Sequence, residues 1–325
     1  MRDKYKRRQQ QELNRQRQQQ ELSSIVSAPV NEALEPQQRL ESSLELSDLV
    51  TRMVMHVICH ILVDYQEQLQ GEHFSVASAF LQRVTSTHLC NHKLTKEGIV
   101  YQYEGQAFQL HEEFKTMTLT RSVYEHLVMF YFLFEHPKSD GERRVVWNYW
   151  KINSKKNLLD YDGDGNVTGG EEQTSACQEI EALRKEIFST EIGIQCRQKL
   201  DEWTRIGKPI QNGCIEFCQR QGQLDVRRVS YNQAWKYLFE KQDMTQLYRH
   251  LSMHCHPIYD GLLQYQSQTL TDEGYDGIPL YLSSCFLAYL CRLFLKRIPD
   301  GNDLLHQAFS KREISIFNTL SHLPS

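Results

Sequence analysis

The residues whose types and spacing are most suited to chemistry lie in an acidic, glycine-rich stretch at residues 160–171, DYDGDGNVTGGE. Oxygen-bearing side chains recur at every second position from 160 to 168, and the stretch ends in a glutamate. Calcium is a hard cation that takes about seven oxygens at roughly 2.4 Å, and a loop of this length can wrap them around it. The stretch therefore predicts a Ca²⁺ cofactor. The expected metal ligands are Asp160, Asp162, Asp164, the backbone carbonyl of Asn166, Thr168 through a water molecule, and bidentate Glu171.

The stretch resembles the calcium loop of the EF-hand family and matches that pattern at every specified position. The resemblance implies a helix on either side of the loop. The flanks depart from the family, because Lys156 stands at an apolar position of the entering helix and Gly169 and Gly170 stand where the leaving helix should begin. No second loop of this spacing occurs in the sequence, so a weaker, isolated site is expected. The alternative is a solvated acidic connection that binds no metal.

A second set of polar residues lies in two other segments. Arg121 and Glu125 are one helical turn apart in an apolar stretch, and Tyr248, Ser252 and His256 recur at every fourth residue. An unpaired buried charge is costly, so the first pair must have partners or line a cleft. We expect a polar cleft between the two segments that holds a ligand or a reaction. A satisfied buried network that fixes the packing is the alternative. The candidate catalytic residues are Arg121, Glu125, Arg249, His254 and His256.

These two segments together resemble an uncharacterised bacterial family of helical proteins, a domain of unknown function of the DUF5677 type. The family pairs an R-x3-E helix, here Arg121 and Glu125, with a later Y-x2-L-S-x3-H-P segment, here residues 248–257. The resemblance extends roughly over residues 45–270, with the calcium-type loop as an insertion. It implies a helical fold and no established activity.

An enzymatic alternative comes from the spacing of arginine and histidine. Arg249 and His254 fit the R-x4-6-H pattern of HEPN-type ribonucleases, which are helical bundles, and Arg121 and His126 fit the same spacing. In such a site the arginine would stabilise the pentavalent phosphate while the histidine moves a proton. With 13 histidines in the chain, a couple of such spacings should also occur by chance. A helical binding or interaction protein and a ribonuclease therefore both stay open.

Other metal and nucleotide motifs do not occur in the sequence. There is no H-E-x-x-H, no C-x2-C, no G-x4-G-K-[ST] and no G-x-S-x-G. Histidine pairs four residues apart, such as His88 and His92, are therefore expected to be pairs on core-facing helices.

The elements that must position these residues are predicted to be helices. Apolar residues at three- and four-residue spacings predict a core-facing helix over residues 43–62. No real sheet is expected at residues 98–105, and residues 213–228 read as a polar connection. The fold class is all-α, a multi-helix bundle with long antiparallel helices and one inserted EF-hand-like loop. The further helices are expected at residues 74–89, 108–136, 142–158, 171–205, 231–241, 244–255, 257–268, 279–297 and 303–320.

The domain organisation follows from composition. Residues 1–38 form a basic, glutamine-rich tail that is expected to be disordered or a frayed helix. Residues 39–325 are expected to form a single helical domain, with the acidic loop at 158–172. The net charge of −4 gives no general attraction to nucleic acid, which would be bound only through the basic tail or a ribonuclease site.

Cysteine usage and hydropathy bear on the compartment. Nine cysteines, an odd number scattered through apolar stretches, favour a reducing environment. The most apolar runs, residues 123–134 and 281–295, are shorter than a bilayer span. We expect a cytoplasmic protein without a membrane span, whose partner is an unidentified protein or ligand.

Overall fold

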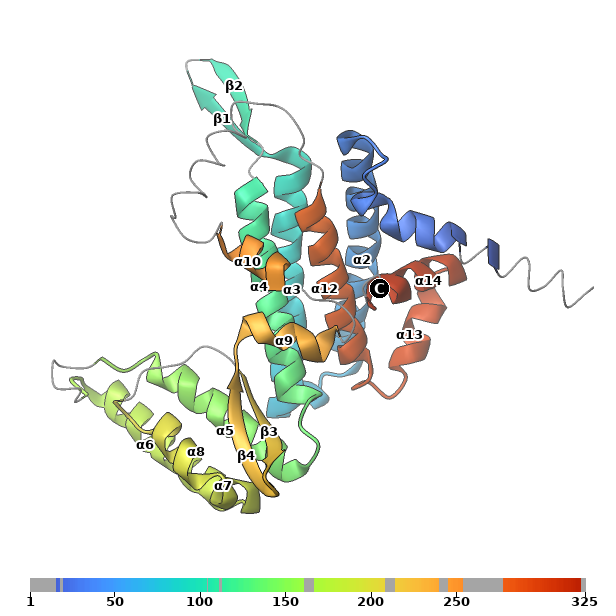
Figure 1. Ribbon diagram of the computed structural model, residues 1–325. Helices are drawn as coiled ribbons and strands as arrows, with labels where there is room; N and C mark the ends of the chain where they lie inside the picture. The colour runs from blue at the N-terminus through green and yellow to red at the C-terminus, as the bar shows by residue number, and fades with distance from the viewer. Residues whose placement is uncertain are drawn as a thin grey trace, which may run out of the picture. The chain divides into compact units, whose positions relative to one another are not determined.

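The computed structural model describes residues 16–17, 20–103, 105–110, 113–160, 167–207, 214–239, 245–253 and 277–322. These residues are predominantly helical, which confirms the all-α class (Figure 1). The chain divides into two compact units. Unit 1 comprises Met1–Leu127 and Lys241–Ser325, and unit 2 comprises Val128–Glu240.

Unit 1 is built around a central apolar helix, α12 (Ile278–Leu295), which packs against α2 (Pro36–Asp64) and α3 (Glu72–Glu97) (Figure 1). Most side chains of α12 are buried, which explains why it is apolar on every side. By length and composition alone, α2 and α12 could each cross a membrane. The most apolar window of α12 is 89% buried, however, as in the core helix of a folded unit. The shorter helices of unit 1 are η1 (Ala28–Val30), η2 (Gln68–Gln70), α10 (Thr245–Met253), α13 (Gly301–Ala308) and α14 (Lys311–Leu320).

The N-terminal segment that the sequence assigns to a tail contributes to this packing. Residues 20–27 are helical, and Val26 and Pro29 are buried. The following short helix, η1, contacts α2. Apolar side chains therefore anchor residues 26–30 on unit 1.

A histidine pair lies in the core of unit 1. His88 is fully buried, and its two ring nitrogens hydrogen-bond to Ser47 Oγ at 2.9 Å and Ser283 Oγ at 2.8 Å. His92 Nδ1 also hydrogen-bonds to Ser47 Oγ at 2.9 Å. Burial lowers the pKa of His88 to about 3, and the neighbouring His92 adds to this effect. Neutral His88 therefore links α2, α3 and α12 through hydrogen bonds.

The helix α4 (Glu113–Phe134) begins later than residue 108, because a β-hairpin precedes it. Strands β1 (Ile99–Tyr103) and β2 (Gln106–Leu110) pair in antiparallel fashion, with Tyr103 opposite Gln106. Gly105 in the turn has a φ of 80°, which a glycine adopts without steric cost. The expectation of no sheet here was wrong, because the turn glycine allows the alternating flanks to pair.

Unit 2 packs two helices, α5 (Asp140–Lys156) and α6 (Glu171–Phe188), against each other. The sequence predicts one helix over residues 171–205, and this was wrong. Thr190 starts a new helix instead, since its hydroxyl accepts a hydrogen bond from the backbone N–H of Gly193 at 2.9 Å. The helices that follow are α7 (Glu191–Gln195), α8 (Arg197–Thr204) and, after a hairpin, α9 (Tyr231–Leu238).

The hairpin of unit 2 replaces the polar connection expected at residues 213–228. Strands β3 (Cys214–Arg220) and β4 (Gln223–Val229) pair in antiparallel fashion through a two-residue turn. Both turn residues have positive φ, 53° at Gln221 and 78° at Gly222, as a tight hairpin turn requires. The prediction was wrong because Gln221 and Gly222 form a tight turn that lets the two flanking segments pair as strands.

The helix predicted over residues 303–320 is also divided, into α13 and α14. Ser310 caps α14 and forms a capping box with Glu313. This local signal is present in the sequence, and it terminates one helix and starts the next.

Candidate functional site

The calcium-type stretch connects α5 to α6. Its expected ligands Asp162, Asp164 and Asn166 lie outside the described residues. Asp160 follows the end of α5, and Glu171 is the first residue of α6. The backbone N–H of Thr168 donates a hydrogen bond to the carbonyl oxygen of Asp160 at 3.0 Å. The first and ninth positions of the pattern are therefore adjacent in space.

The glutamine that follows the pattern contacts its first ligand. Gln173 Nε2 donates a hydrogen bond to Asp160 Oδ2 at 2.8 Å. The same amide lies against Gly169, where a Cβ atom would stand 1.5 Å from Gln173 Oε1. A side chain at position 169 would therefore displace the end of the Gln173 side chain. Within the described parts of the chain, no group of three or more His, Cys, Asp or Glu side chains is placed to hold a metal.

A polar cluster in unit 1 unites two of the candidate catalytic residues. Arg121 Nε donates to Glu125 Oε1 at 2.8 Å, and the Tyr248 hydroxyl of α10 donates to the same oxygen at 3.0 Å. The side chains of Arg121 and Glu125 are 21% and 28% exposed. The structure therefore brings the R-x3-E helix and the tyrosine of the later segment together.

Aromatic rings support this Arg121–Glu125–Tyr248 cluster. The Tyr248 ring lies 5.5 Å from the ring of Tyr124, which in turn lies 5.3 Å from Phe286 of α12. The Arg121 guanidinium lies 5.4 Å from the centre of the Tyr248 ring. Burial, followed by the negative charge of Glu125, raises the pKa of Tyr248. Its hydroxyl thus stays protonated and donates to the carboxylate.

The remaining candidates lie elsewhere. Arg249 is exposed on α10, while His254 and His256 lie outside the described residues. Ser252 donates its hydroxyl to the backbone oxygen of Tyr248 at 2.7 Å. His126, the proposed partner of Arg121, hydrogen-bonds through Nδ1 to the backbone oxygen of Ser122 at 2.7 Å.

The orientation of His126 differs from that of Arg121. The His126 ring lies against Phe80 of α3, whereas Arg121 faces Tyr248 of α10. Residues five apart on an α-helix point about 140° away from each other. The two side chains are therefore directed toward different neighbouring helices.

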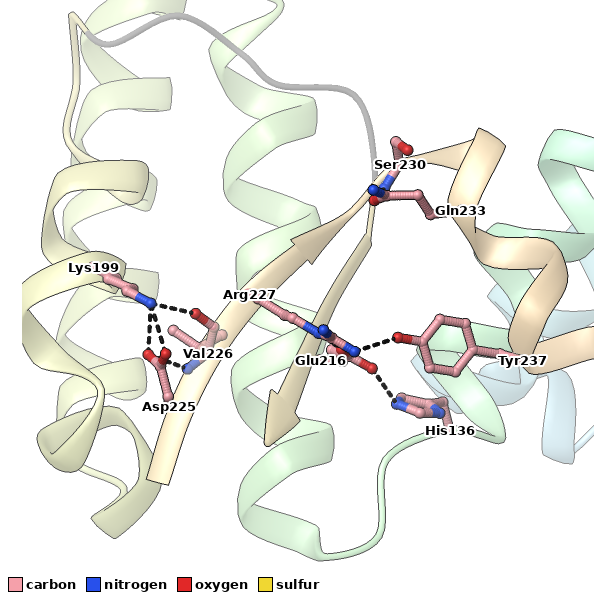
Figure 2. Close-up of polar contacts among 9 residues, drawn as sticks. All are labelled: His136, Lys199, Glu216, Asp225, Val226, Arg227, Ser230, Gln233 and Tyr237. Carbon is pink, nitrogen blue, oxygen red and sulfur yellow. Dashed lines mark hydrogen bonds and ion pairs between the residues drawn. The ribbon is translucent and has the colours of Figure 1, made fainter. Parts of the chain in front are cut away.

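A cluster in unit 2 was not found from the sequence (Figure 2). Glu216 of β3 is only 4% exposed, and its carboxylate accepts a hydrogen bond from Arg227 of β4, the residue opposite it in the hairpin. Arg227 Nη2 donates to the Tyr237 hydroxyl at 3.0 Å. His136 Nε2 lies 3.7 Å from Glu216 Oε2. The buried carboxylate thus meets two residues of unit 2, Arg227 and His136, and Tyr237 holds Arg227 in place.

The surroundings of His136 are aromatic. Its ring lies 4.8 Å from Phe132 and 5.3 Å from Tyr237. Burial, with a contribution from Lys138, lowers the pKa of His136. One signal for this cluster is present in the sequence: Cys214, Glu216 and Cys218 recur at every second position, as side chains on one face of a strand do. The expectation of a connection at residues 213–228 leaves this signal unused.

A second contact fixes the hairpin to α8. Lys199 Nζ donates to both carboxylate oxygens of Asp225, at 2.7 and 2.8 Å, and to the backbone oxygen of Val226 at 3.2 Å (Figure 2). The adjacent amide of Val226 donates to Asp225 Oδ1 at 2.8 Å. The charged groups of both hairpin clusters therefore have hydrogen-bond partners within unit 2, as is typical of residues that stabilise packing.

Comparison with known proteins gives one match. A family model described as a family of unknown function (DUF5677) matches residues 106–275, which is more than half of the chain. No curated protein and no solved structure matches the chain. The matched range includes the Arg121–Glu125–Tyr248 cluster and unit 2 but leaves out α2, α3 and α12. The resemblance read from the arginine, glutamate and tyrosine segments is confirmed, and the chain belongs to the family of unknown function DUF5677.

Proposed function

We propose that the protein is a helical binding protein in which calcium, held by the stretch between α5 and α6, stabilises that helix pair. The observation that carries this proposal is the complete oxygen-ligand spacing of residues 160–171, bounded by two helices that pack on each other. Four carboxylates within twelve residues repel one another, and a divalent cation relieves that repulsion. Asp160 and Glu171, both exposed at the ends of the stretch, would supply its first and last ligands.

Existing contacts between α5 and α6 explain what calcium would add. Asn148 Nδ2 donates to Glu186 Oε2 at 2.9 Å, and Lys155 forms an ion pair with Glu179. Both contacts join the two helices along their length. A cation between Asp160 and Glu171 would join them at the connecting end, and Asp160 would exchange its hydrogen bond from Gln173 for the metal.

The polar cluster of unit 1 supports the binding-protein class. A catalytic group must aim at an open position where a reacting atom can sit. The Arg121 guanidinium and the Tyr248 hydroxyl instead donate to one carboxylate, that of Glu125. This arrangement suits residues that fix the packing of α4 and α10. The partner is an unidentified protein or ligand.

Calorimetric titration of the whole protein with calcium and with magnesium tests the proposal. A lone site with a Kd of about 10⁻⁴ M should add about 1.4 kcal/mol to the free energy of unfolding at about 1 mM calcium. Magnesium should add much less, because it prefers a tight octahedron and gives up its waters reluctantly. Equal melting temperatures in calcium and in chelator would overturn the proposal.

A matched pair of variants locates the site. Glu171→Gln removes the bidentate carboxylate of the pattern and should abolish most of the calcium-dependent rise in melting temperature. Glu172→Gln makes the same charge change at the next exposed residue and should keep that rise. Loss of the calcium effect in both variants would indicate only nonspecific attraction to acidic charge.

The exposure of Arg249 favours a second candidate function, the HEPN-type ribonuclease acting through Arg249 and His254. An exposed arginine on α10 is free to meet a phosphate of an RNA strand. Purified protein should then cleave single-stranded RNA, and Arg249→Ala should reduce the rate at least about 100-fold. Arg312→Ala, a change at another exposed arginine, should leave the rate unchanged. Equal rates in Arg249→Ala and the wild type would exclude this candidate.

A further inference from the structure

Unit 2 contains a buried lysine. Lys156, near the end of α5, stands at the apolar position noted in the sequence and is only 1% exposed. Its Nζ donates one hydrogen bond, to the backbone oxygen of Trp203 at 2.9 Å. An ammonium group carries three N–H donors. Within the described residues, two of the three therefore have no acceptor.

Two arginines lie close to this ammonium group, Arg184 of α6 and Arg228 of β4. Burial is the main reason that the pKa of Lys156 falls to about 8, and the charges of Arg184 and Arg228 lower it further. The guanidinium of Arg228 lies 4.3 Å from the centre of the Trp203 ring. All three cations contact α8: Lys156 through the backbone oxygen of Trp203, Arg228 through the Trp203 ring, and Arg184 through Asp201.

The donors of this group are incompletely satisfied. Arg184 pairs with Glu181 at 2.6 Å and Asp201 at 2.5 Å, yet its Nε is buried and, over the described residues, has no acceptor. The Nε of Arg228 is also buried without an acceptor among the described residues, and no described carboxylate forms an ion pair with Arg228. Lys156 likewise lacks a carboxylate partner among them.

Burying like charges without a counter-charge is costly, and buried N–H donors nearly always have an acceptor. Glu181 and Asp201 neutralise Arg184, and Asp201 also pairs with Arg205 at 2.6 Å. The charge of buried Lys156 and that of half-buried Arg228, whose Nε is inaccessible, have no counter-charge among the described residues. An anion that accepts several hydrogen bonds at once would balance both the charge and the donors.

We propose that Lys156, Arg184 and Arg228 form a binding site in unit 2 for a small oxyanion of the phosphate class. A tetrahedral oxyanion presents acceptors in several directions, which suits donors that come from three elements and all contact α8. Arginine binds phosphate oxygens with high directionality. The ligand is either inorganic phosphate or the phosphoryl group of a small organic ester. The site uses none of residues 160–171 and does not depend on calcium binding.

Melting of the full-length protein in phosphate and in chloride, at equal ionic strength and pH 7, tests the proposal. About 10 mM phosphate should raise the Tm by about 3 °C or more. Lys156→Met and Arg228→Gln should each lose that difference, and calorimetry should show phosphate binding weakened by about tenfold or more. Lys185→Met, which removes an exposed lysine next to Arg184, should behave as the wild type.

The variants also distinguish phosphate binding at this site from the general effect of phosphate on protein stability. Phosphate stabilises many proteins weakly by exclusion from their surface, and that effect should be equal in all four proteins. Lys156→Met should melt no lower than the wild type in chloride, because it removes a charge without a partner. If it fails to fold, Arg228→Gln carries the test, since Arg228 has no ion pair among the described residues.

Titrations with inorganic phosphate and with phosphate esters identify the source of the oxyanion. Tighter binding of inorganic phosphate than of phosphoserine or adenosine monophosphate assigns the site to the free ion, and the reverse order assigns it to an ester. Absence of phosphate binding to the wild type, or equal binding to Lys156→Met, would overturn the proposal. Water molecules would then be the acceptors of these donors.

Discussion

Gln173 donates a hydrogen bond from its side-chain amide to the carboxylate of Asp160, 13 residues earlier, at 2.8 Å. Asp160 is the first expected calcium ligand, so the amide and the cation compete for the same carboxylate. Gln173→Ala should therefore bind calcium about fivefold more tightly, since one hydrogen bond contributes about 1 kcal/mol net. Gln178→Ala, at an exposed position of the same helix, is the control for calorimetric titration. Unchanged affinity in Gln173→Ala would show that the amide does not compete.

Arg121 and Tyr248 share the carboxylate of Glu125 as acceptor, so substitutions in this cluster should lower the stability by different amounts. Glu125→Ala leaves both Arg121 and Tyr248 without this carboxylate and should lower the free energy of unfolding by about 2 kcal/mol. Glu125→Gln keeps one oxygen acceptor and should cost less, and Tyr248→Phe should cost about 1 kcal/mol. Urea unfolding measures all three. A loss below about 0.5 kcal/mol in Glu125→Ala would mean that water replaces the carboxylate.

The buried carboxylate of unit 2 predicts a larger effect. Glu216→Ala leaves Arg227 without its acceptor and opens a space beside His136, and it should destabilise by about 3 kcal/mol. Glu202→Ala, at an exposed position of α8, should change stability by less than about 0.5 kcal/mol. Denaturant unfolding compares the two variants. Equal midpoints would contradict a structural role for Glu216.

Lys156 predicts how stability depends on pH. Its pKa is lowered from 10.5 to about 8 in the folded state, so between these values the unfolded chain binds more protons. Stability should therefore rise from about pH 8 to about pH 10.5, and the gain should be lost as the pH falls back through 8. Lys156→Met should lack this rise in urea unfolding at several pH values. A parallel pH profile in wild type and variant would show that the lysine titrates normally.

His88 predicts acid sensitivity at lower pH. Its pKa falls from 6.5 to about 3 on folding, so the unfolded chain binds more protons between these values. Stability should decrease as the pH falls below about 6.5, by at most about 1.4 kcal/mol per pH unit from this residue. His88→Gln cannot titrate and should flatten the profile relative to the wild type. An unchanged slope in the variant would assign the acid sensitivity to carboxylates instead.

Much of the helical fold could be predicted because its signals are local. The apolar spacing of residues 43–62 and the predominantly apolar run of residues 281–295 predicted the core helices α2 and α12. The spacing of Arg121 and Glu125 puts them on one helix face, where the expectation is that they have partners or line a cleft. The calcium-type pattern is likewise contained in twelve consecutive residues.

Other features depend on contacts between distant residues. The hairpin β3–β4 forms because two strands of mixed polarity pair across a tight turn, and that pairing puts Glu216 opposite Arg227. Periodicity could not show this, since alternating polar residues fit a solvated connection equally well. Lys156, Arg184 and Arg228 are separated by 28 and 44 residues in the chain, and no local pattern links them.

The sequence by itself determined where most of the helices lie but not all of their ends, because hydrogen bonds and apolar stripes within a helix depend on residues three and four apart. It also determined the oxygen-ligand spacing of residues 160–171. Only the tertiary structure decided which charges share a buried environment, because burial and the approach of Lys156 to Arg184 and Arg228 depend on how α5, α6 and β4 pack. Removing these charged groups from water costs free energy, and a single stretch of sequence does not show which groups are removed from water.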